Sequence, residues 1–266
     1  MKFIKTDNIE EINALRVELY QKLTAPIDVM WEKLYIDSAQ HFFIENNEEN
    51  IGYCCIDDKG SLLQLFLKKE YHTLMNKVIT SLIEAKKISS ASLSSNEPIS
   101  YNTCLHHSKS IATNTFCFQH SNTIIDSKSS LKLELALEDN IPSIKSFLKE
   151  QIGMDDTFGY TENLVARKEI YTVTNNDEII ATSECRWSDS QPEIADLGII
   201  VNKNHRGKGI ATQVLQIQAN RVLKANRKPI CSTTFDNIAS RKAIERAGFY
   251  CSNIIFDMNF VNDNNK

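Results

Sequence analysis

The chain has 266 residues, of which 42% are hydrophobic and 24% are charged, and its formal net charge is -4. This composition is typical of a globular protein and lacks the basic excess or basic runs of a protein that binds nucleic acid or anionic lipid. The amino terminus has no signal-peptide core and no stretch approaches membrane-spanning length, so we expect a cytoplasmic protein without a nucleic-acid or membrane partner.

The first half of the chain predicts alternating helices and strands. Asp7 and Asn8 form an N-cap pattern, and apolar residues follow at helical spacing from Ile9 to Leu19. Two strands joined by an Asn-rich turn come next, at 41–46 and 50–56. The remaining predicted elements are a strand at 62–67, a helix at 72–87, a strand at 88–94, a helix at 97–108 and a strand at 113–119.

The second half predicts the same order of elements after a polar joint, "DSKSS", at 126–130. Its first helix follows Asp139 and Asn140 and carries Pro142 in its first turn, where a missing N–H costs little. Residues 150–168 are expected to form a loop. The later predicted elements are strands at 169–174, 178–187 and 194–201, a helix at 208–224, a strand at 229–235, a helix at 238–247 and a strand at 249–260.

Three short segments recur in the same order in the two halves. "DNIEEI" at 7–12 returns as "DNIPSI" at 139–144, and "NNEENI" at 46–51 returns as "NNDEII" at 175–180. "SNEPIS" at 95–100 returns more loosely as "DNIASR" at 236–241. The repeat predicts two domains, 1–125 and 131–266, each a mixed α/β (α+β) domain with helices flanking a mostly antiparallel sheet.

The seven cysteines predict neither a disulfide framework nor a metal site. None forms a C-x-x-C pair, and most stand in apolar strand-like runs, which favours buried, reduced thiols. His106 and His107 are expected on a solvated helix face rather than on a metal.

The segment "HRGKGIA" at 205–211 concentrates glycine in a chain that has only eight glycines. Gly207 and Gly209 lie between an apolar strand and an amphipathic helix, where unpaired backbone N–H groups stand at the positive end of the helix dipole. Glycines leave these amides open, and Arg206 and Lys208 add positive charge. The pattern predicts a phosphate or diphosphate site, although neither the Walker motif nor the complete dinucleotide fingerprint is present.

The pattern R-x-x-G-x-A that begins at Arg206 resembles the acetyl-CoA loop of the Gcn5-related N-acetyltransferase (GNAT) superfamily. "DNIASRKAIERAGF" at 236–249 is similar to the family's later N-x-x-S…G-F segment, so that the resemblance covers most of residues 131–260. It implies an acetyl-CoA-dependent N-acetyltransferase, with acetyl-CoA as cosubstrate and an amine-bearing acceptor. The residues that it assigns to the cofactor are Ile199, Ile200, Val201, Arg206, Gly207, Lys208, Gly209, Ile210, Ala211, Thr212, Asn237 and Ser240. A tight turn and a helix cap are the alternative roles of the glycines and of Asn237.

The first copy lacks this loop. Its counterpart, "LFLKKEYHTLMNK" at 65–77, has no glycine and places Leu74 and Met75 where open amides are needed. We expect residues 1–125 to keep the fold without this cofactor-binding loop. Their expected role is to bind the acceptor, shape the cleft or support the second domain. Tandem GNAT proteins with one degenerate copy, including antibiotic self-resistance acetyltransferases, look similar.

The resemblance implies direct attack of a neutral amine on the thioester, which requires a proton acceptor. Asp196, at the start of the strand before the loop, ranks first and Glu184, on the adjacent strand, ranks second; Glu193 is expected to be a surface acid. Many family members carry a tyrosine that protonates the thiolate, but Ile244 stands at that position. Either water, Ser240 or a nearby tyrosine serves as the donor, or the thiolate leaves without one.

The predicted acceptor is a small-molecule amine, such as an amino-acid-like metabolite or an antibiotic. A protein lysine or an amino terminus is the alternative acceptor. The missing tyrosine and the degenerate first copy also allow a non-catalytic acyl-CoA-binding or protein-interaction module, or a scaffold without a ligand. The sequence assigns no oligomeric state.

Overall fold

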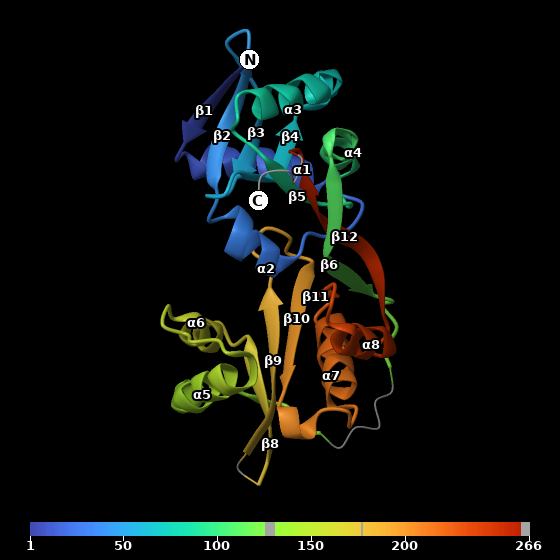
Figure 1. The fold of residues 1–266 in the computed structure, drawn as a ribbon. Coiled ribbons are helices and arrows are strands. Elements are labelled where there is room, and N and C mark those ends of the chain that lie inside the picture. The colour runs from blue at the N-terminus through green and yellow to red at the C-terminus, as the bar shows by residue number, and fades with distance from the viewer. Residues whose placement is uncertain (126–130, 177, 262–266) are drawn as a thin grey trace. The chain divides into compact units, whose positions relative to one another are not determined.

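The computed structural model describes residues 1–125, 131–176 and 178–261, so the predicted joint at 126–130 lies outside the described residues (Figure 1). The chain divides into two units. The first contains Met1–Cys117 and the segment from Ser252 onward, and the second contains Phe118–Cys251. Each unit is a mixed sheet flanked by helices, which confirms the predicted fold class.

The first unit has the strand order β1-β2-β3-β4-β5-β12-β6. Its strands are β1 (Lys2–Thr6), β2 (Gln40–Asn46), β3 (Glu49–Ile56), β4 (Ser61–Leu67), β5 (Ser90–Ser94), β6 (Ser110–His120) and β12 (Phe249–Asn259). Its helices are α1 (Ile9–Tyr20), α2 (Val29–Trp31), α3 (Met75–Glu84) and α4 (Pro98–His107). A π-helical turn, Glu32–Ile36, continues α2, and a 3-10 helix, Lys69–Leu74, precedes α3.

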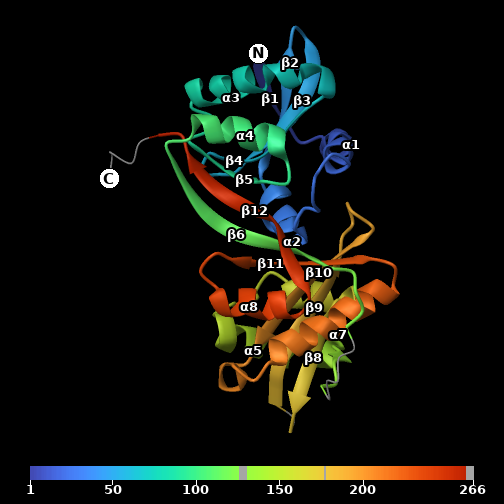
Figure 2. The same ribbon diagram turned by 90° about the vertical axis from the view of Figure 1, so that its right-hand side faces the viewer.

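Helices cover both faces of this first sheet (Figure 2). On one face, Ile12 and Leu19 of α1 pack against Tyr53 and Phe66 of the sheet. On the other face, the apolar stripe of α3 packs against β4, and Cys104 of α4 joins the same cluster. Because both faces are covered, β4 is buried along its whole length.

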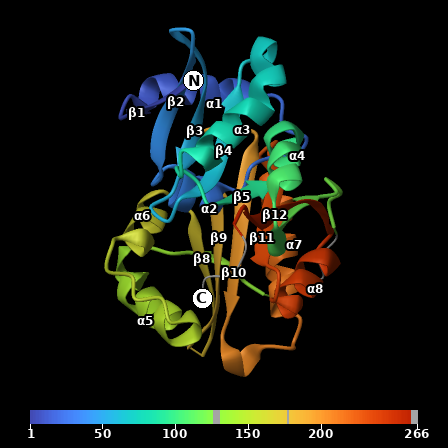
Figure 3. The same ribbon diagram turned by 45° about the horizontal axis from the view of Figure 1, so that its top comes forward.

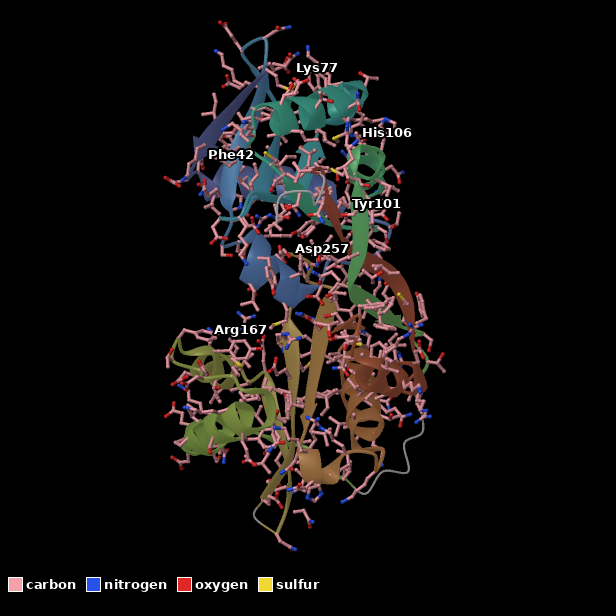
Figure 4. All side chains as sticks on the ribbon, in the orientation of Figure 1. Phe42, Lys77, Tyr101, His106, Arg167 and Asp257 are labelled. Atoms are coloured by element: carbon pink, nitrogen blue, oxygen red, sulfur yellow. The ribbon has the colours of Figure 1, made fainter. Side chains whose placement is uncertain are left out.

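The last strand of the chain, β12, pairs with β5 of the first unit. The antiparallel register runs from Ile255 opposite Ser94 to Asn259 opposite Ser90. Asp257, labelled in Figure 4, accepts hydrogen bonds from the Ser92 hydroxyl at 2.6 Å and the Asn114 amide at 2.9 Å. The sequence placed this strand in a domain of residues 131–266, but its pairing and buried side chains attach the described residues 252–261 to the first unit.

The second unit has the strand order β6-β11-β10-β9-β8-β7, to which β6 contributes its last residues. The strands are β7 (Glu134–Leu135), β8 (Ile170–Asn175), β9 (Glu178–Trp187), β10 (Ile194–Val201) and β11 (Lys228–Thr234). The helices are α5 (Ile141–Ile152), α6 (Tyr160–Ala166), α7 (Ile210–Lys224) and α8 (Ile238–Arg246), with 3-10 turns at Glu138–Asn140 and Lys203–His205.

In the second unit, α5 and α6 cover one face of the sheet and α7 covers the other (Figures 1 and 3). Ile144, Phe147 and Leu148 of α5 form one core with Leu164 and Val165 of α6. Ile210 and Val214 of α7 form the other core with Val173, Ile180 and Ala181 of the strands. The two cores hold β9 and β10 between helix layers.

Most predicted helices and strands are present, but residues 150–168 are not the continuous loop that we expected. Residues up to Ile152 extend α5, and α6 begins at Tyr160. The carboxylate of Asp156 accepts hydrogen bonds from the amides of Tyr160 at 2.9 Å and Thr161 at 2.6 Å, which fixes the start of α6. A helix this short has too few residues for a helical period to show in the sequence.

Among the described residues, six cysteines are buried and Cys251 is exposed, as expected for most of them. Burial raises the pKa of Cys55, Cys104 and Cys185 to about 12, which keeps these thiols protonated. His106 and His107 end α4, where His107 contacts the Asn76 side chain at 2.8 Å. No helix in the described part of the chain combines the length and the hydropathy needed to cross a bilayer.

Candidate functional site

In the part of the chain that the structure describes, strands β10 and β11 pair only at one end. Their parallel register runs from Ile194 opposite Lys228 to Asp196 opposite Ile230, while β10 itself continues to Val201. Ile194 to Leu197 are buried and Gly198 to Val201 are partly exposed. Beyond Asp196, β10 therefore presents a backbone edge that β11 does not pair within the described register.

The loop after β10 leaves the start of α7 open. Gly207 and Gly209 have φ angles of 76° and 78°, which are left-handed conformations that favour glycine. A Cβ added to Gly207 would meet nothing within 4 Å, and one added to Gly209 would meet only the Gln213 side chain at 3.7 Å. Among the described residues, no side chain caps α7 at Gly209. The first-turn amides of a 15-residue helix are therefore available to an anion.

The charge of this loop is positive and exposed. Arg206 and Lys208 lie on the surface, and no acidic residue occurs between Val201 and Thr212. Arg206 Nε donates to the carbonyl of Val201 at 3.2 Å, and Lys208 Nζ donates to the carbonyl of Asn204 at 3.3 Å. These backbone bonds hold both side chains beside the glycines.

The other residues assigned to the cofactor divide into backbone and side-chain positions. The side chain of Ile210 is buried, and the Thr212 hydroxyl donates to the carbonyl of Ala243 at 3.3 Å. Ile210 thus offers only backbone groups, and the small Ala211 follows it in the helix. Asn237 accepts a hydrogen bond from the Ser240 amide at 3.1 Å, so it caps α8, the alternative role considered for it.

Ile199, Ile200 and Val201 also offer their backbone rather than their side chains. Ile199 and Val201 pack on the core beneath α7, whereas Ile200 packs on the core beneath α5 and α6. All three side chains therefore pack against the cores, and the backbone N–H and C=O groups of this strand edge are available to a ligand.

The two candidate acids meet in one cluster on the α5–α6 face of the sheet. Arg186 forms ion pairs with Glu184 and with Asp196, the latter at 3.0 Å. The Tyr160 hydroxyl donates to Glu184 Oε2 at 2.7 Å. The side chain of Asp196 is fully buried, while that of Glu184 is 10% exposed. Of the two acids, only Glu184 has any exposed side-chain surface.

Gly198 provides the space for this cluster. It lies opposite Glu184 in the register of β9 and β10. A Cβ at this position would come within 3.0 Å of Arg186 Nη1 and 3.4 Å of Glu184 Oε2. The absence of a side chain lets the guanidinium lie directly over β10, close to the point where β10 and β11 separate.

The sequence missed Tyr160, which lies in the segment that we expected to be a loop. Burial and the neighbouring Glu184 raise the pKa of Tyr160, so its hydroxyl stays protonated. Ile244 is 2% exposed, so the side chain at the usual tyrosine position is part of the core. Tyr160 thus supplies a tyrosine hydroxyl to this cluster. No sequence motif relates the position of Tyr160 to that of Glu184, so the contact could not be predicted from spacing.

The corresponding segment of the first unit is built differently. The 3-10 helix Lys69–Leu74 leads into α3, and the amide of Met75 already donates to the carbonyl of His72. Met75 is 4% exposed, and Leu74 packs on the same core. Their side chains point inward rather than over the helix start, so what differs from the second unit is the closed 3-10 turn and the lack of glycine.

Comparisons with known proteins agree with these features. Models of the acetyltransferase (GNAT) domain match residues 8–121 and residues 142–250. A search of curated proteins found no match. A GNAT-family acetyltransferase from Colwellia psychrerythraea is 28% identical, covers 98% of this chain and 100% of its own, and superposes with a TM-score of 0.93.

Two more distant structures share the fold. A Gcn5-related N-acetyltransferase from Sphaerobacter thermophilus is 9% identical over 98% of this chain and 96% of its own, with a TM-score of 0.67. A tandem GNAT protein from the clavulanic acid biosynthesis pathway is 10% identical over 98% and 99%, with a TM-score of 0.60. The chain belongs to the GNAT acetyltransferase family and carries two GNAT domains in tandem.

Proposed function

We propose that this protein is an acetyl-CoA-dependent N-acetyltransferase that acetylates a primary amine of a small molecule, and that its second unit holds acetyl-CoA. The observation that carries the proposal is the open start of α7, where two left-handed glycines and two exposed cations adjoin an unpaired strand edge.

The cofactor would lie along these two features. The diphosphate fits the first-turn amides of α7, with Arg206 and Lys208 neutralising its charge. The extended pantetheine arm then adds to the free edge of β10 at Ile199 to Val201, as an extended peptide adds to the edge of a sheet. This path leads the thioester toward Gly198 and the acid cluster, because Gly198 is the next residue along the same strand.

The chemistry is a direct transfer. The amine nitrogen forms a bond to the acetyl carbon, the C–S bond breaks and its electron pair leaves with the CoA sulfur, while the amine gives up a proton. We propose Glu184 as the proton acceptor, since its carboxylate is the more exposed of the two acids. Asp196 is then a positioning residue that holds Arg186. Tyr160, whose hydroxyl is bonded to Glu184, is the candidate donor that returns a proton to the thiolate.

A small acceptor suits the access to this cluster. Only 10% of the Glu184 side chain is exposed, and α6 brings the Tyr160 hydroxyl to it. An unhindered amine on a narrow molecule fits this approach better than an amine held at the surface of a folded protein.

The direct test is release of CoA thiol from acetyl-CoA with a panel of small amines, and with lysine peptides as the comparison class. Turnover with a small amine, abolished by Arg206→Ala and by Gly209→Leu, is expected. Unchanged turnover in both variants contradicts the assigned cofactor site.

The same assay separates the alternative, a non-catalytic acyl-CoA-binding module. The buried Ile244 is the observation that favours it, because no donor stands at the usual tyrosine position. Acetyl-CoA binding without turnover on any amine or peptide would assign the protein to this class.

A further inference from the structure

A buried serine on β9 holds one carbonyl group of β10. Ser183 and Gln218 are both fully buried, and Ser183 lies opposite Ile199 in the register of the two strands. The Ser183 hydroxyl donates to the carbonyl of Gly198 at 3.0 Å, and the side-chain amide of Gln218, on α7, donates to Ser183 Oγ at 3.4 Å. These two hydrogen bonds form a chain that runs from α7 to the backbone of β10.

The direction of this chain follows from the chemistry of its members. A serine hydroxyl has one hydrogen to donate, and the Gly198 carbonyl can only accept. That hydrogen therefore lies between Ser183 and Gly198, which leaves the serine oxygen to accept from Gln218 Nε2. Gln218 Oε1 is buried without a hydrogen-bond partner among the described residues, an arrangement that costs free energy. Packing alone would favour an apolar side chain here, so the N–H donation is what distinguishes Gln218.

The strand register sets the direction of the Gly198 carbonyl. The Asn202 amide donates to the carbonyl of Ile180 at 2.9 Å. The Ser188 amide likewise donates to the carbonyl of Ile194 at 3.2 Å. In an antiparallel ladder, hydrogen-bonded pairs alternate with pairs that are not hydrogen-bonded. Gly198 lies an even number of residues from both Asn202 and Ile194, so its carbonyl also points toward β9.

The same peptide group places an N–H on the opposite side of β10. A trans peptide is planar, and its C=O and N–H point in opposite directions. The N–H of Ile199 therefore points away from β9, toward the edge that β11 does not pair beyond Asp196 in the described register. Hydrogen bonds in a chain polarise one another and strengthen by about 10–30% per bond. The bonds at the Gly198 carbonyl thus both fix and strengthen the Ile199 donor.

We propose that Ser183 and Gln218 are positioning residues for acetyl transfer, which act through the Gly198 carbonyl to aim and polarise the Ile199 N–H at the thioester oxygen of acetyl-CoA. The inference rests on the proposed function, which brings the thioester toward Gly198. A fixed donor aimed at the oxygen that gains negative charge during attack lowers the barrier. Neither positioning side chain touches the substrate, because both are fully buried beneath α7.

The test observes the thioester carbonyl itself. Acetyl-CoA with ¹³C at the acetyl carbonyl is bound to the full chain without an amine, and the isotope difference in the infrared spectrum isolates the C=O stretch. A hydrogen bond to this oxygen weakens the C=O bond, so we expect binding to the wild type to lower the stretching frequency. Ser183→Ala should remove most of this shift, while the Kd for acetyl-CoA changes by less than about twofold because the diphosphate contacts remain. With any amine that the wild type acetylates, kcat should fall about tenfold at an unchanged KM for acetyl-CoA.

Two further variants separate positioning from packing. Gln218→Met removes the N–H donor while keeping the approximate side-chain volume, and it should reduce the frequency shift less than Ser183→Ala does. Because the two residues act in series, the double variant should behave like Ser183→Ala alone. Thr182→Val is the matched control, since it removes a buried hydroxyl from the adjacent residue of β9, opposite Ile200, and should keep the wild-type shift.

The inference is overturned if Ser183→Ala and Gln218→Met both bind acetyl-CoA with the wild-type frequency shift, or if Thr182→Val reduces the shift as much as Ser183→Ala. Additive losses in the double variant also contradict it, because they show that Ser183 and Gln218 act separately. A wild type that binds no acetyl-CoA contradicts the proposed function, and the inference falls with it. Normal binding with unaltered shifts contradicts the positioning role alone.

Discussion

Gly207 and Gly209 show how much of the candidate site depends on single residues. Both hold positive φ angles, and the space that a side chain would fill at Gly207 is empty. Gly153, at the C-cap of α5, has a nearly equal φ of 72° and also meets nothing within 4 Å. The two glycine positions thus share their backbone conformation, and only the one before α7 adjoins open amides.

Alanine substitutions at Gly209 and Gly153 test this difference. Gly209→Ala and Gly153→Ala should each destabilise the fold by about 1–2 kcal/mol, the cost of a left-handed alanine. Only Gly209→Ala should also weaken acetyl-CoA binding, by about tenfold or more (about 1.4 kcal/mol), because its methyl group intrudes on the amides. Chemical denaturation and calorimetric titration measure the two effects. Equal affinities in the two variants would show that the amides at α7 do not bind the cofactor.

Substitutions of the two acids, Glu184 and Asp196, should likewise differ in their effects on turnover and on stability. Glu184→Gln is expected to lower kcat about 100-fold, as for a general base, and to cost less stability than Asp196→Ala, because the amide oxygen still accepts from Arg186 and Tyr160. Asp196→Ala is expected to lower the free energy of unfolding by about 3–5 kcal/mol, because it removes the fully buried partner of Arg186 and leaves that charge with Glu184 alone. Tyr160→Phe removes only the hydroxyl that is proposed to protonate the thiolate, and it should also lower kcat. A stable Asp196→Ala protein with impaired turnover would reverse the two roles.

The sequence predicted the glycine loop and the acids but neither their arrangement nor Tyr160. Arg206, Gly207 and Gly209 are close in sequence, so their spacing alone indicates an anion site. Tyr160 and Glu184 are 24 residues apart, and Arg186 joins Glu184 to Asp196 only because the register of β9 and β10 sets Arg186 opposite Asp196. Such contacts depend on strand register, which the sequence did not define.

At the level of elements, the two units differ at the start of the helices α3 and α7. The helices α3 and α7 occupy equivalent places in the predicted repeat, but a 3-10 helix closes the start of α3 and a glycine turn opens that of α7. Helical period predicted both helices correctly. It could not predict the 3-10 helix, since apolar spacing does not report how a helix begins.

The helix α6 depends on its cap. Burial alone would raise the pKa of Asp156, but hydrogen bonds from Thr161 and Tyr160 outweigh it and the pKa is lowered. The ionised cap therefore stabilises the fold fully above the unfolded pKa of about 3.9, and this contribution is lost as the pH falls below that value through the folded pKa.

Asp156→Asn should accordingly lower the unfolding free energy at pH 7 by about 1 kcal/mol, the usual worth of such a cap. The difference from the wild type should shrink below about pH 3.9. Denaturant titrations at several pH values measure it. Asp155→Asn is the control, because Asp155 is exposed and its carboxylate pairs with the exposed Lys149 at 3.2 Å. A difference that persists unchanged at low pH would contradict the role of the carboxylate charge.

At the scale of the whole molecule, the last strand of the chain, β12, completes the sheet of the first unit. The repeat in the sequence predicted two successive domains, because it compares segments along the chain and contains no information about which strand pairs with which. The pairing of β12 with β5 shows instead that residues from both ends of the chain build the first unit.

Removal of residues 252–266 should therefore destabilise the first unit, although those residues follow the second unit in sequence. Loss of β12 exposes an edge of β5 and removes Met258, which is fully buried. Hydrogen exchange should show lower protection in β4 and β5 than in the full chain. A chain that ends after Val261 is the control, and unchanged protection after the longer deletion would contradict this assignment of β12.

The central claim, that one of the two units holds the cofactor, is tested most directly by calorimetric titration of the full chain with acetyl-CoA. The account predicts one site per chain and loss of that site in Arg206→Ala. Two sites per chain, or one site that Arg206→Ala leaves intact, would contradict it.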